Sequence, residues 1–331
     1  MRQLMISLDK KILDKDSTVA RRMIEYGKTN ELFILIPDGE KLSFDLSPTV
    51  HIQSAGGLKF LQFFSLINLG GKILKNFNIE EISTQDPFFT GLIGVFLKLL
   101  STSKLEVQIH GDFFSSQYYR RSGLNNLIRY WLAKAFVLRY ADRLRVVGGR
   151  IQESLIRLGI DKNKIYIKPI AIVSDYINNY QPKFNLRDKY PGYKKIFICL
   201  GRLDQVKNII WLVNIFAKIV QKNSEYLLLI VGNGPEEGKI RARIRVLGLE
   251  KNVKMENWTD DPVSDVKTSS CLLFPSLSEG CGLVAMEAYA VGTPIIMSNV
   301  GVANYELKPS DKVKILPIND KEKWIEAILK S

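Results

Sequence analysis

Cysteine and histidine are scarce in this sequence, with three cysteines and two histidines among 331 residues. Three cysteines are too few for the disulfide framework that holds small secreted domains together. Two of them, Cys199 and Cys271, fall in apolar stretches of strand length. We therefore expect the chain to work in a reducing compartment, the cytoplasm.

Long apolar runs are also missing. The longest, FFTGLIGVFLKLL at residues 88–100, is interrupted by Lys98 and is shorter than the roughly 20 residues that a bilayer span needs. The first residues, MRQLMISLDKK, contain only a short apolar stretch and lack the pattern of a signal peptide. Both observations predict a chain without a transmembrane helix.

Acidic residues are outnumbered by basic ones, which gives a formal net charge of +13 and a pI near 9.5. Such a charge attracts anions, a class that includes phosphorylated substrates, acidic lipid surfaces and nucleic acid. The hydrophobic content of 46% and the charged content of 24% are ordinary for a globular chain. The length predicts two domains of roughly 150 residues each.

Short apolar runs alternate with helical patterns in the second half. We expect strands at 195–201, 226–232, 253–257, 271–276, 294–298 and 313–317, and helices at 208–222, 236–246 and 282–290. This alternation predicts an α/β fold with a parallel, doubly wound sheet.

The first half follows the same rhythm less regularly, with expected strands at 3–8, 31–37, 81–85, 105–111 and 143–148. A polar stretch rich in Tyr, Asn and Pro at 174–195 predicts the linker. The expected division is therefore a Rossmann-like domain at 1–172 and a second at 173–331. Ligands of such sheets bind outside the carboxyl ends of the strands, so the segments after each strand are the places to inspect.

The segment GRLDQVKN (201–208) follows an expected strand and places Arg202 and Lys207 at the entry to a helix. Unpaired amides and the helix dipole favour an anion there, and two cations would add charge-assisted hydrogen bonds suited to a diphosphate. The alternative is that both are solvated charges at a helix end.

The segment GNGPEEG (232–238) imitates a dinucleotide fingerprint, but a lone glycine pattern is weak evidence. Glu236 and Glu237 stand where a pyrophosphate would bind and would repel it. We interpret this segment as a structural turn.

The segment SEGCGLVAMEAYAVGTP (278–294) contains Glu279 and Glu287 with seven residues between them. Gly280 and Gly282 allow close approach of a ligand to amides at a helix start. The carboxylates would lie about 12 Å apart if the steps between them were all helical. That spacing suits two ends of one extended ligand better than one metal ion.

PSLSEGCGLVAMEAYAVGTPII closely resembles the Glu-x7-Glu signature of the GT4-type retaining glycosyltransferases (glycosyltransferase group 1), which have the GT-B fold. LGRLDQVKN is similar to that family's donor-phosphate segment. ISTQDPFFTGLIG and QIHGDFF resemble its acceptor-side pieces. The resemblance covers residues 80 to 306 and is most specific in 195–295. It implies two Rossmann-like domains that face each other across a cleft.

The resemblance also implies a role for each matching residue. Arg202 and Lys207 would bind the donor diphosphate in place of a metal, and Glu287 would bind the nucleotide ribose. Glu279 would face the transferred sugar, with His110 near its reacting side. The amides of Gly280, Cys281, Gly282 and Leu283 would hold the donor, and Asn257 and Trp258 would cradle the base. No metal and no cofactor are implied. For His110 the alternative is a hydrogen-bonded residue at a strand end.

The first loop departs from the family pattern, because many members have a glycine-rich loop there. Asp16, Ser17, Thr18 and Arg21, with Asp112, are therefore candidates for acceptor contacts. The run DKD (14–16) imitates an Asp-x-Asp metal motif, but Asp16-Ser17 also suits a helix cap.

Residues 113–143 interleave aromatic and basic side chains. One interpretation is an amphipathic helix at an anionic membrane, such as the inner face of the cell membrane. The other is an ordinary helix with solvated charges. No nucleic-acid-binding module surrounds this segment.

The predicted function is metal-independent transfer of a sugar from a nucleotide-diphosphate sugar to a glycan or lipid-linked glycan acceptor, as in polysaccharide or glycolipid synthesis. Two rivals stay open: an NAD(P)-dependent Rossmann oxidoreductase, and a catalytically silent nucleotide-sugar-binding protein of the same fold.

Overall fold

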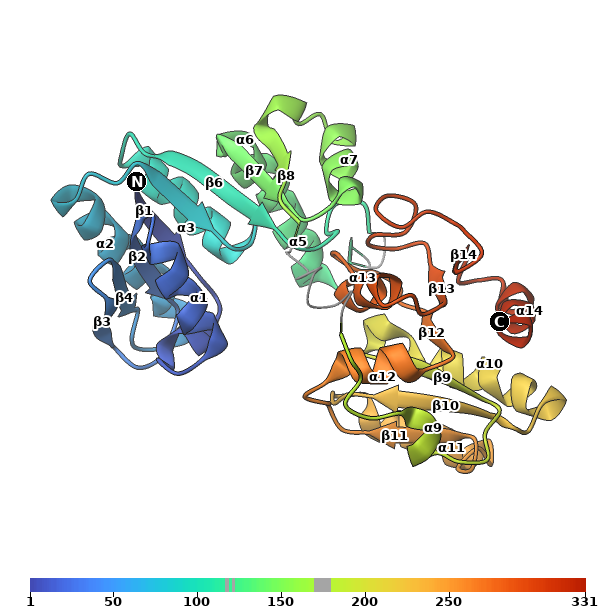
Figure 1. The fold of residues 1–331 in the computed structure, drawn as a ribbon. Helices are drawn as coiled ribbons and strands as arrows, with labels where there is room; N and C mark the ends of the chain where they lie inside the picture. The colour runs from blue at the N-terminus through green and yellow to red at the C-terminus, as the bar shows by residue number, and fades with distance from the viewer. Residues whose placement is uncertain (117–118, 121–122, 170–179) are drawn as a thin grey trace. The chain divides into compact units, whose positions relative to one another are not determined.

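The structure is a computed structural model that describes residues 1–116, 119–120, 123–169 and 180–331. The chain divides into two compact units (Figure 1). The N-terminal unit comprises Met1–Val147 and Ile151–Lys168, and the C-terminal unit comprises Gly148–Arg150 and Pro169–Ser331. The predicted boundary between residues 172 and 173 lies outside the described residues.

The N-terminal unit contains an eight-stranded sheet in the order β3-β4-β2-β1-β5-β6-β7-β8. Its strands are β1 (Arg2–Ile6), β2 (Glu31–Ile36), β3 (Ser43–Ser47), β4 (Val50–Ser54), β5 (Glu81–Thr84), β6 (Lys104–Ile109), β7 (Arg143–Val146) and β8 (Ile165–Ile167). Its helical segments are η1 (Lys10–Leu13), α1 (Thr18–Gly27), α2 (Lys59–Asn76), α3 (Phe89–Leu99), α5 (Leu124–Leu132), the π-helix η2 (Ala133–Val137), α6 (Leu138–Tyr140), α7 (Gly149–Arg157) and η3 (Lys162–Lys164). The first two residues of α7 belong to the C-terminal unit.

Three strands of this sheet were not expected from the sequence. β4 and β8 extend its parallel part, and β3 pairs with β4 in the antiparallel direction. The prediction of a parallel sheet is therefore correct for β4 to β8 and wrong at the β3 edge. The sequence of β3, SFDLS, alternates apolar and polar residues, because an edge strand of this kind is only half-covered.

In the part of the first sheet formed by β5 to β8, one of the two faces is polar. In β6 the side chains of Leu105, Val107 and Ile109 are fully buried, and Glu106 and Gln108 alternate with them. Both polar residues are nearly buried as well. Because successive side chains of a strand point to opposite faces, the sheet carries an apolar face and a polar one in this region.

The C-terminal unit contains a six-stranded parallel sheet in the order β11-β10-β9-β12-β13-β14. Its strands are β9 (Lys195–Leu200), β10 (Tyr226–Val231), β11 (Val253–Glu256), β12 (Cys271–Phe274), β13 (Ile295–Ser298) and β14 (Val313–Leu316). Its helical segments are α9 (Leu186–Lys189), η4 (Gln205–Lys207), α10 (Ile209–Lys222), α11 (Glu237–Val246), α12 (Pro262–Thr268), α13 (Leu283–Ala290) and α14 (Lys321–Lys330). All six expected strands and all three expected helices are present.

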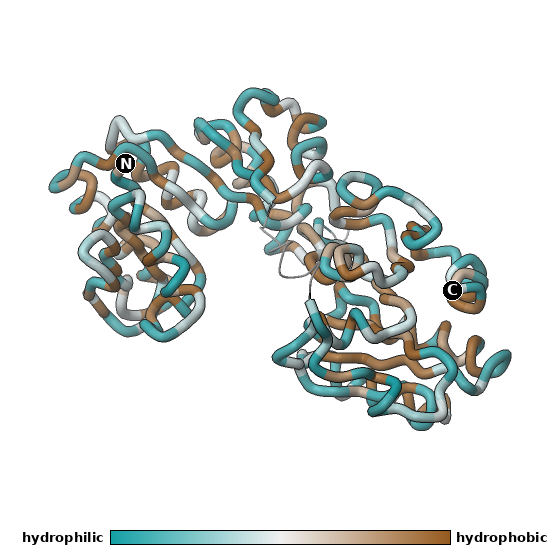
Figure 2. Tube along the Cα trace, in the orientation of Figure 1, coloured by the Kyte–Doolittle hydropathy of each residue, from teal (hydrophilic) through white to brown (hydrophobic). Residues whose placement is uncertain are grey.

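The two cores of this unit lie on opposite faces of its sheet. Helices α10, α11 and α14 cover one face, where Phe216 and Trp324 are fully buried. Helices α9, α12 and α13 cover the other face. The strands β9 and β10 run between them as hydrophobic, brown segments (Figure 2). Counted along the unit, the strand order is 3-2-1-4-5-6, which is the Rossmann order.

The glycine-rich turn after β10 is built by close packing against the loop after β9. A Cβ atom at Gly234 would lie 2.3 Å from the carbonyl oxygen of Leu203. The same carbonyl accepts a 2.9 Å hydrogen bond from the Glu236 amide. These contacts explain the turn without a ligand, in agreement with its interpretation as structural.

We predict that Gly234→Ala lowers the free energy of unfolding by about 1–3 kcal/mol, because the added methyl group displaces the Leu203 backbone. Gly238→Ala is the matched control, since a Cβ atom there meets nothing within 4 Å and alanine favours a helix by up to about 1 kcal/mol. Urea denaturation measures both variants. Equal stabilities would contradict the packing argument.

Candidate functional site

The candidate site of the C-terminal unit lies where the order of its strands reverses. β9 and β12 are neighbours in the sheet, and the chain leaves them toward opposite sides. Such a switch point leaves a crevice outside the carboxyl ends of the two strands. The loops that follow β9 and β12 are joined there by a 2.8 Å hydrogen bond from the Leu277 amide to the Val206 carbonyl.

Lys207 and Glu279 meet at this point as an ion pair. The Lys207 Nζ lies 2.5 Å from the Glu279 Oε1, and the two side chains are 21% and 12% exposed. The same Nζ lies 5.4 Å from the centre of the Phe274 ring, at the end of β12. Asp204 caps the turn η4 through the Lys207 amide. The structure thus brings together two of the predicted site residues, one from each loop.

Arg202 lies on the same loop but points into solvent. Its side chain is 74% exposed, and its Nε is 3.9 Å from the Asp204 carboxylate. Among the described residues it has no shorter ion pair, so the guanidinium remains available for an anion.

The predicted glycine segment forms the entry to α13. Gly282 is its N-cap with a φ of +85°, a conformation that favours glycine. The described residues provide no side-chain cap for this helix. The Cys281 carbonyl accepts a 3.0 Å bond from the Val302 amide, and a Cβ atom at Gly301 would lie 2.5 Å from that carbonyl. Burial raises the pKa of the Cys281 thiol to about 11, so it stays protonated near neutral pH.

Glu287 lies half-buried on α13. No hydrogen bond or ion pair to its side chain occurs within the described residues. Burial alone raises the pKa of its carboxyl group, because no cation or donor offsets the desolvation. Such a carboxylate is well suited to accept hydrogen bonds from ligand hydroxyls.

Asn257 and Trp258 follow β11 and are held by Asn233, a residue that the sequence interpretation missed. The Asn233 side chain donates to Asn257 Oδ1 at 3.0 Å and accepts from the Trp258 amide at 2.8 Å. Trp258 is 53% exposed. In the sequence, the only indication of these hydrogen bonds was the asparagine between Gly232 and Gly234.

In the N-terminal unit, His110 follows the last residue of β6 and is exposed, with its Nε2 3.1 Å from Gln108 Oε1. Neighbouring groups still desolvate the ring, which lowers the pKa of His110, and the charges of Arg145 and Arg22 lower it further. Asp112 is nearly buried and accepts bonds from the amide and hydroxyl of Ser115. This geometry favours a structural role for Asp112.

The acceptor-side candidates of the first loop divide into one cap, Ser17, and three exposed residues, Asp16, Thr18 and Arg21. Ser17 is the N-cap of α1, where its hydroxyl accepts from the Ala20 amide at 3.0 Å and donates to the Lys11 carbonyl at 2.6 Å. Within the described residues, no group of three or more His, Cys, Asp or Glu side chains could hold a metal ion.

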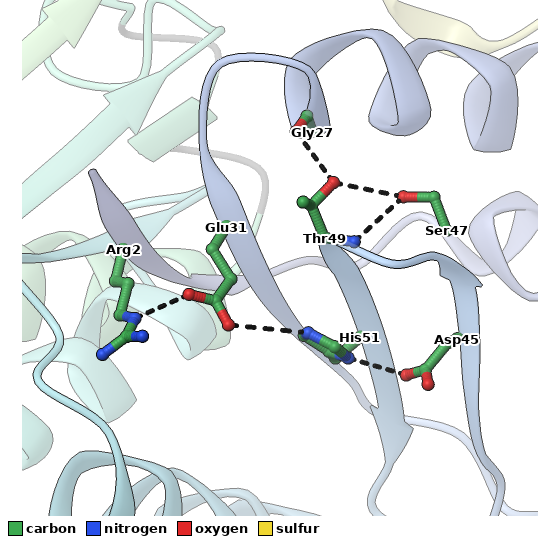
Figure 3. A network of polar contacts seen from close by, with 7 residues as sticks. All are labelled: Arg2, Gly27, Glu31, Asp45, Ser47, Thr49 and His51. Atoms are coloured by element: carbon green, nitrogen blue, oxygen red, sulfur yellow. Dashed lines mark hydrogen bonds and ion pairs between the residues drawn. The ribbon is translucent and has the colours of Figure 1, made fainter.

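His51, the other histidine, lies near the amino end of β4 in a polar network (Figure 3). Its Nδ1 is 2.7 Å from Asp45 and its Nε2 is 3.8 Å from Glu31, which in turn binds Arg2. Because His110 follows the carboxyl end of β6, the two histidines mark opposite ends of the sheet. His51 holds strands together.

Solved structures of glycosyltransferases share this architecture. The structure resembles the lipopolysaccharide outer core galactosyltransferase WaaB (TM-score 0.70, 18% identity, 99% of this chain and 89% of that one). It also resembles HepE of Anabaena in complex with UDP (TM-score 0.74, 14% identity, 100% and 89%). Two Rossmann-like parallel-sheet units with these neighbours define a fold of the GT-B class.

The similarity to a family lies in the second half of the chain. Residues 183–331 match the model of the glycosyl transferases group 1. A relative from Escherichia coli, UDP-Gal:alpha-D-GlcNAc-diphosphoundecaprenol alpha-1,3-galactosyltransferase, is 26% identical over 274 residues, which are 80% of this chain and 69% of the relative. The expected GT-B fold is thus confirmed, and the second half of the chain matches glycosyltransferase group 1, as expected.

We predict that Glu287→Gln stabilises the ligand-free chain at pH 7 by about 0.5–1 kcal/mol, a value discounted for the partial exposure of the side chain. The pKa of Glu287 is higher in the folded state than in the unfolded state. Ionisation therefore lowers stability as pH rises through the unfolded value, and below that value the gain disappears. Urea denaturation at pH 4 and pH 7 measures this difference. A gain equal to that of Glu225→Gln, an exposed control, would contradict the burial argument.

Proposed function

We propose that this chain is a metal-independent, retaining glycosyltransferase that moves a sugar from a nucleotide-diphosphate sugar to a glycan or lipid-linked glycan acceptor. The observation that carries the proposal is the 2.5 Å pair of Lys207 and Glu279 at the switch point. It stands beside an uncapped helix start and an unpartnered Glu287. The family of residues 183–331 supports the same reaction class.

The departing nucleoside diphosphate develops negative charge, which Lys207 and Arg202 are placed to offset from one loop. Fixed cations and helix amides stabilise a developing anion best when they are already oriented. Lys207 is oriented by Glu279 before any ligand arrives. Glu287 accepts the ribose hydroxyls, and Glu279 with the amides of 280–283 holds the sugar. The sugar passes through an oxocarbenium-like state, as in glycoside hydrolysis.

The acceptor class is proposed from relatives. The Escherichia coli relative is named for a diphosphoundecaprenol-linked acceptor, and another, from Staphylococcus aureus, for capsular polysaccharide biosynthesis. We propose an acceptor of this kind, bound mainly by the N-terminal unit, with the reaction on the cytoplasmic side of the membrane.

The oxidoreductase alternative is disfavoured by the turn after β10. Glu236 and Glu237 occupy the start of α11, where they pair with Lys239 and Arg241. A dinucleotide pyrophosphate at this helix start would meet two carboxylates. The other alternative, a catalytically silent nucleotide-sugar-binding protein, differs from the proposed enzyme only in lacking turnover, so an assay of sugar transfer distinguishes the two.

We predict that Arg202→Ala weakens binding of the cognate nucleoside diphosphate by about 10- to 100-fold, the value of one charge-assisted bond to phosphate. The cognate nucleotide is found first by a thermal-shift screen of nucleotide-diphosphate sugars, since a ligand at 100 times its Kd stabilises by about 2.7 kcal/mol. Titration calorimetry then measures the loss.

The control is Arg245→Ala, which removes an exposed arginine from α11 and leaves binding unchanged. Affinity for the corresponding nucleoside is unchanged in both variants. Wild-type affinity of Arg202→Ala for the diphosphate would refute the phosphate assignment. Sugar transfer that EDTA abolishes would refute metal independence.

We also propose that the N-terminal unit lies on an anionic membrane surface. On α5, Leu124, Ile128 and Trp131 are 71%, 49% and 56% exposed and recur at helical spacing on one face. No acidic residue occurs from 113 to 141. Basic side chains of this segment that the structure describes are Arg120, Arg129, Lys134 and Arg139.

The neighbouring helices continue this surface. The connections from β4 through β7 all run in one direction along the sheet, so right-handed crossovers put α2, α3 and α5 on one face. Phe60 and Phe64 of α2 are 70% and 67% exposed, and neither α2 nor α3 contains an acidic residue. Exposed apolar and basic groups together favour an interfacial location. None of the described helices is long and apolar enough to cross a bilayer.

We predict that the double variant Leu124→Glu/Ile128→Glu lowers binding to phosphatidylglycerol-containing vesicles by about tenfold or more, because it removes apolar contacts and adds repulsion. Co-sedimentation measures the effect, with pure phosphatidylcholine vesicles as the uncharged comparison. Val246→Glu, on α11 and 74% exposed in the native chain, is the control. Equal binding of all three proteins would refute the membrane proposal.

A further inference from the structure

Arg145 stands out on the polar face of the first sheet. It lies on β7, in register with Gln108 of β6 on one side and Tyr166 of β8 on the other. Its strand neighbours Leu144 and Val146 are fully buried in the apolar core. A β-strand needs no arginine at this position, so strand formation does not account for the residue.

The guanidinium of Arg145 has no partner among the described residues. Its Nε is buried without a hydrogen bond, and no ion pair or hydrogen bond to its other nitrogens occurs there. Buried donors are nearly always satisfied in native proteins, and leaving one unsatisfied costs about 1–3 kcal/mol. A buried donor left unmet in this way indicates a missing acceptor.

The nearby acidic groups are already engaged. Glu106 is bound by the Tyr166 hydroxyl and by Ser83, and Glu81 accepts a 2.6 Å bond from Gln3. Tyr166 is the register partner of Arg145 on β8. Among the described residues, neither carboxylate forms an ion pair with the guanidinium of Arg145. Burial raises the pKa of Tyr166, and Glu106 and Glu81 raise it further. The charge of Arg145 lowers it, so Arg145 acts on this group at longer range without pairing.

Two further cationic or protonatable groups lie near Arg145, toward the carboxyl edge of the sheet. His110 follows β6 two residues after Gln108, its hydrogen-bond partner. Arg22 comes from α1, is exposed and lacks a carboxylate partner within the described residues. Both arginines act on the His110 ring by their charge. The three groups come from three different elements: Arg145 from β7, His110 from the end of β6 and Arg22 from α1.

We propose that Arg145, His110 and Arg22 bind an oxyanion, a phosphate or carboxylate group carried by the substrate of the N-terminal unit. This inference rests on the proposed function for its substrate and deepens it by naming an anionic acceptor group. A guanidinium can bind both oxygens of such a group at once. The bound anion supplies the acceptor that Arg145 lacks and lies next to His110.

The test uses His110 as a reporter, because the chain contains only two histidines. Histidine NMR spectra of the full chain are recorded against pH with and without inorganic phosphate, and His51→Gln assigns the two signals. The Arg202→Ala background weakens phosphate binding at the β9 loop. We expect phosphate to raise the pKa of His110 by about 1, the effect of a nearby opposite charge, and to leave His51 unchanged.

Arg145→Gln abolishes this phosphate effect, and Arg145→Lys retains part of it because the charge remains without the planar fork. Arg143→Gln, on the same strand at its other end, is the matched control and retains the full effect. An acetate titration distinguishes a carboxylate site from a phosphate site by the larger response. A phosphate effect that survives Arg145→Gln, or no effect in the parent chain, overturns the proposal. Neither result depends on sugar transfer, so it separates this inference from the proposed function.

Discussion

The ion pair between Lys207 and Glu279 is the contact on which the candidate site depends. It joins loops that are 72 residues apart in sequence, and it does so where the two central strands of the sheet end together. The backbone bond between Leu277 and Val206 holds the loops beside it. Partial burial weakens the screening of both charges. A phosphate that reaches Lys207 therefore competes with a carboxylate that has already fixed the ammonium in place.

The second sheet was predicted in full because four of its strands, β9, β10, β12 and β13, are almost continuous apolar runs separated by helical patterns. The first sheet shows where this signal fails. β3 is a half-covered edge strand and β8 has only three residues, so neither produces a run of strand length. β4 alternates around His51 and Gln53. Its polar positions are explained by pairing with β3, which no local pattern reveals.

The candidate site divides in the same way. Motif spacing located Lys207, Glu279 and Glu287, since residues that follow adjacent parallel strands must end at one edge. It did not distinguish caps from ligand contacts, and the hydroxyl of Ser17 and the carboxylate of Asp112 satisfy backbone amides. Arg145 was missed because a sequence does not state which face of a strand is left uncovered. The role of Asn233 arises from hydrogen bonds between two loops, and that of Arg145 from the register of neighbouring strands.

The close contact between Gly301 and the Cys281 carbonyl has a consequence for how this protein can vary. A side chain at 301 would push on the backbone that carries Glu279, whose Cβ lies 3.0 Å from the same point. The two segments therefore depend on each other sterically, and we expect a change of shape in one to require a compensating change in the other. Relatives that alter donor choice by reshaping this loop should show paired substitutions at both places, and libraries that randomise only one should be poor in folded variants.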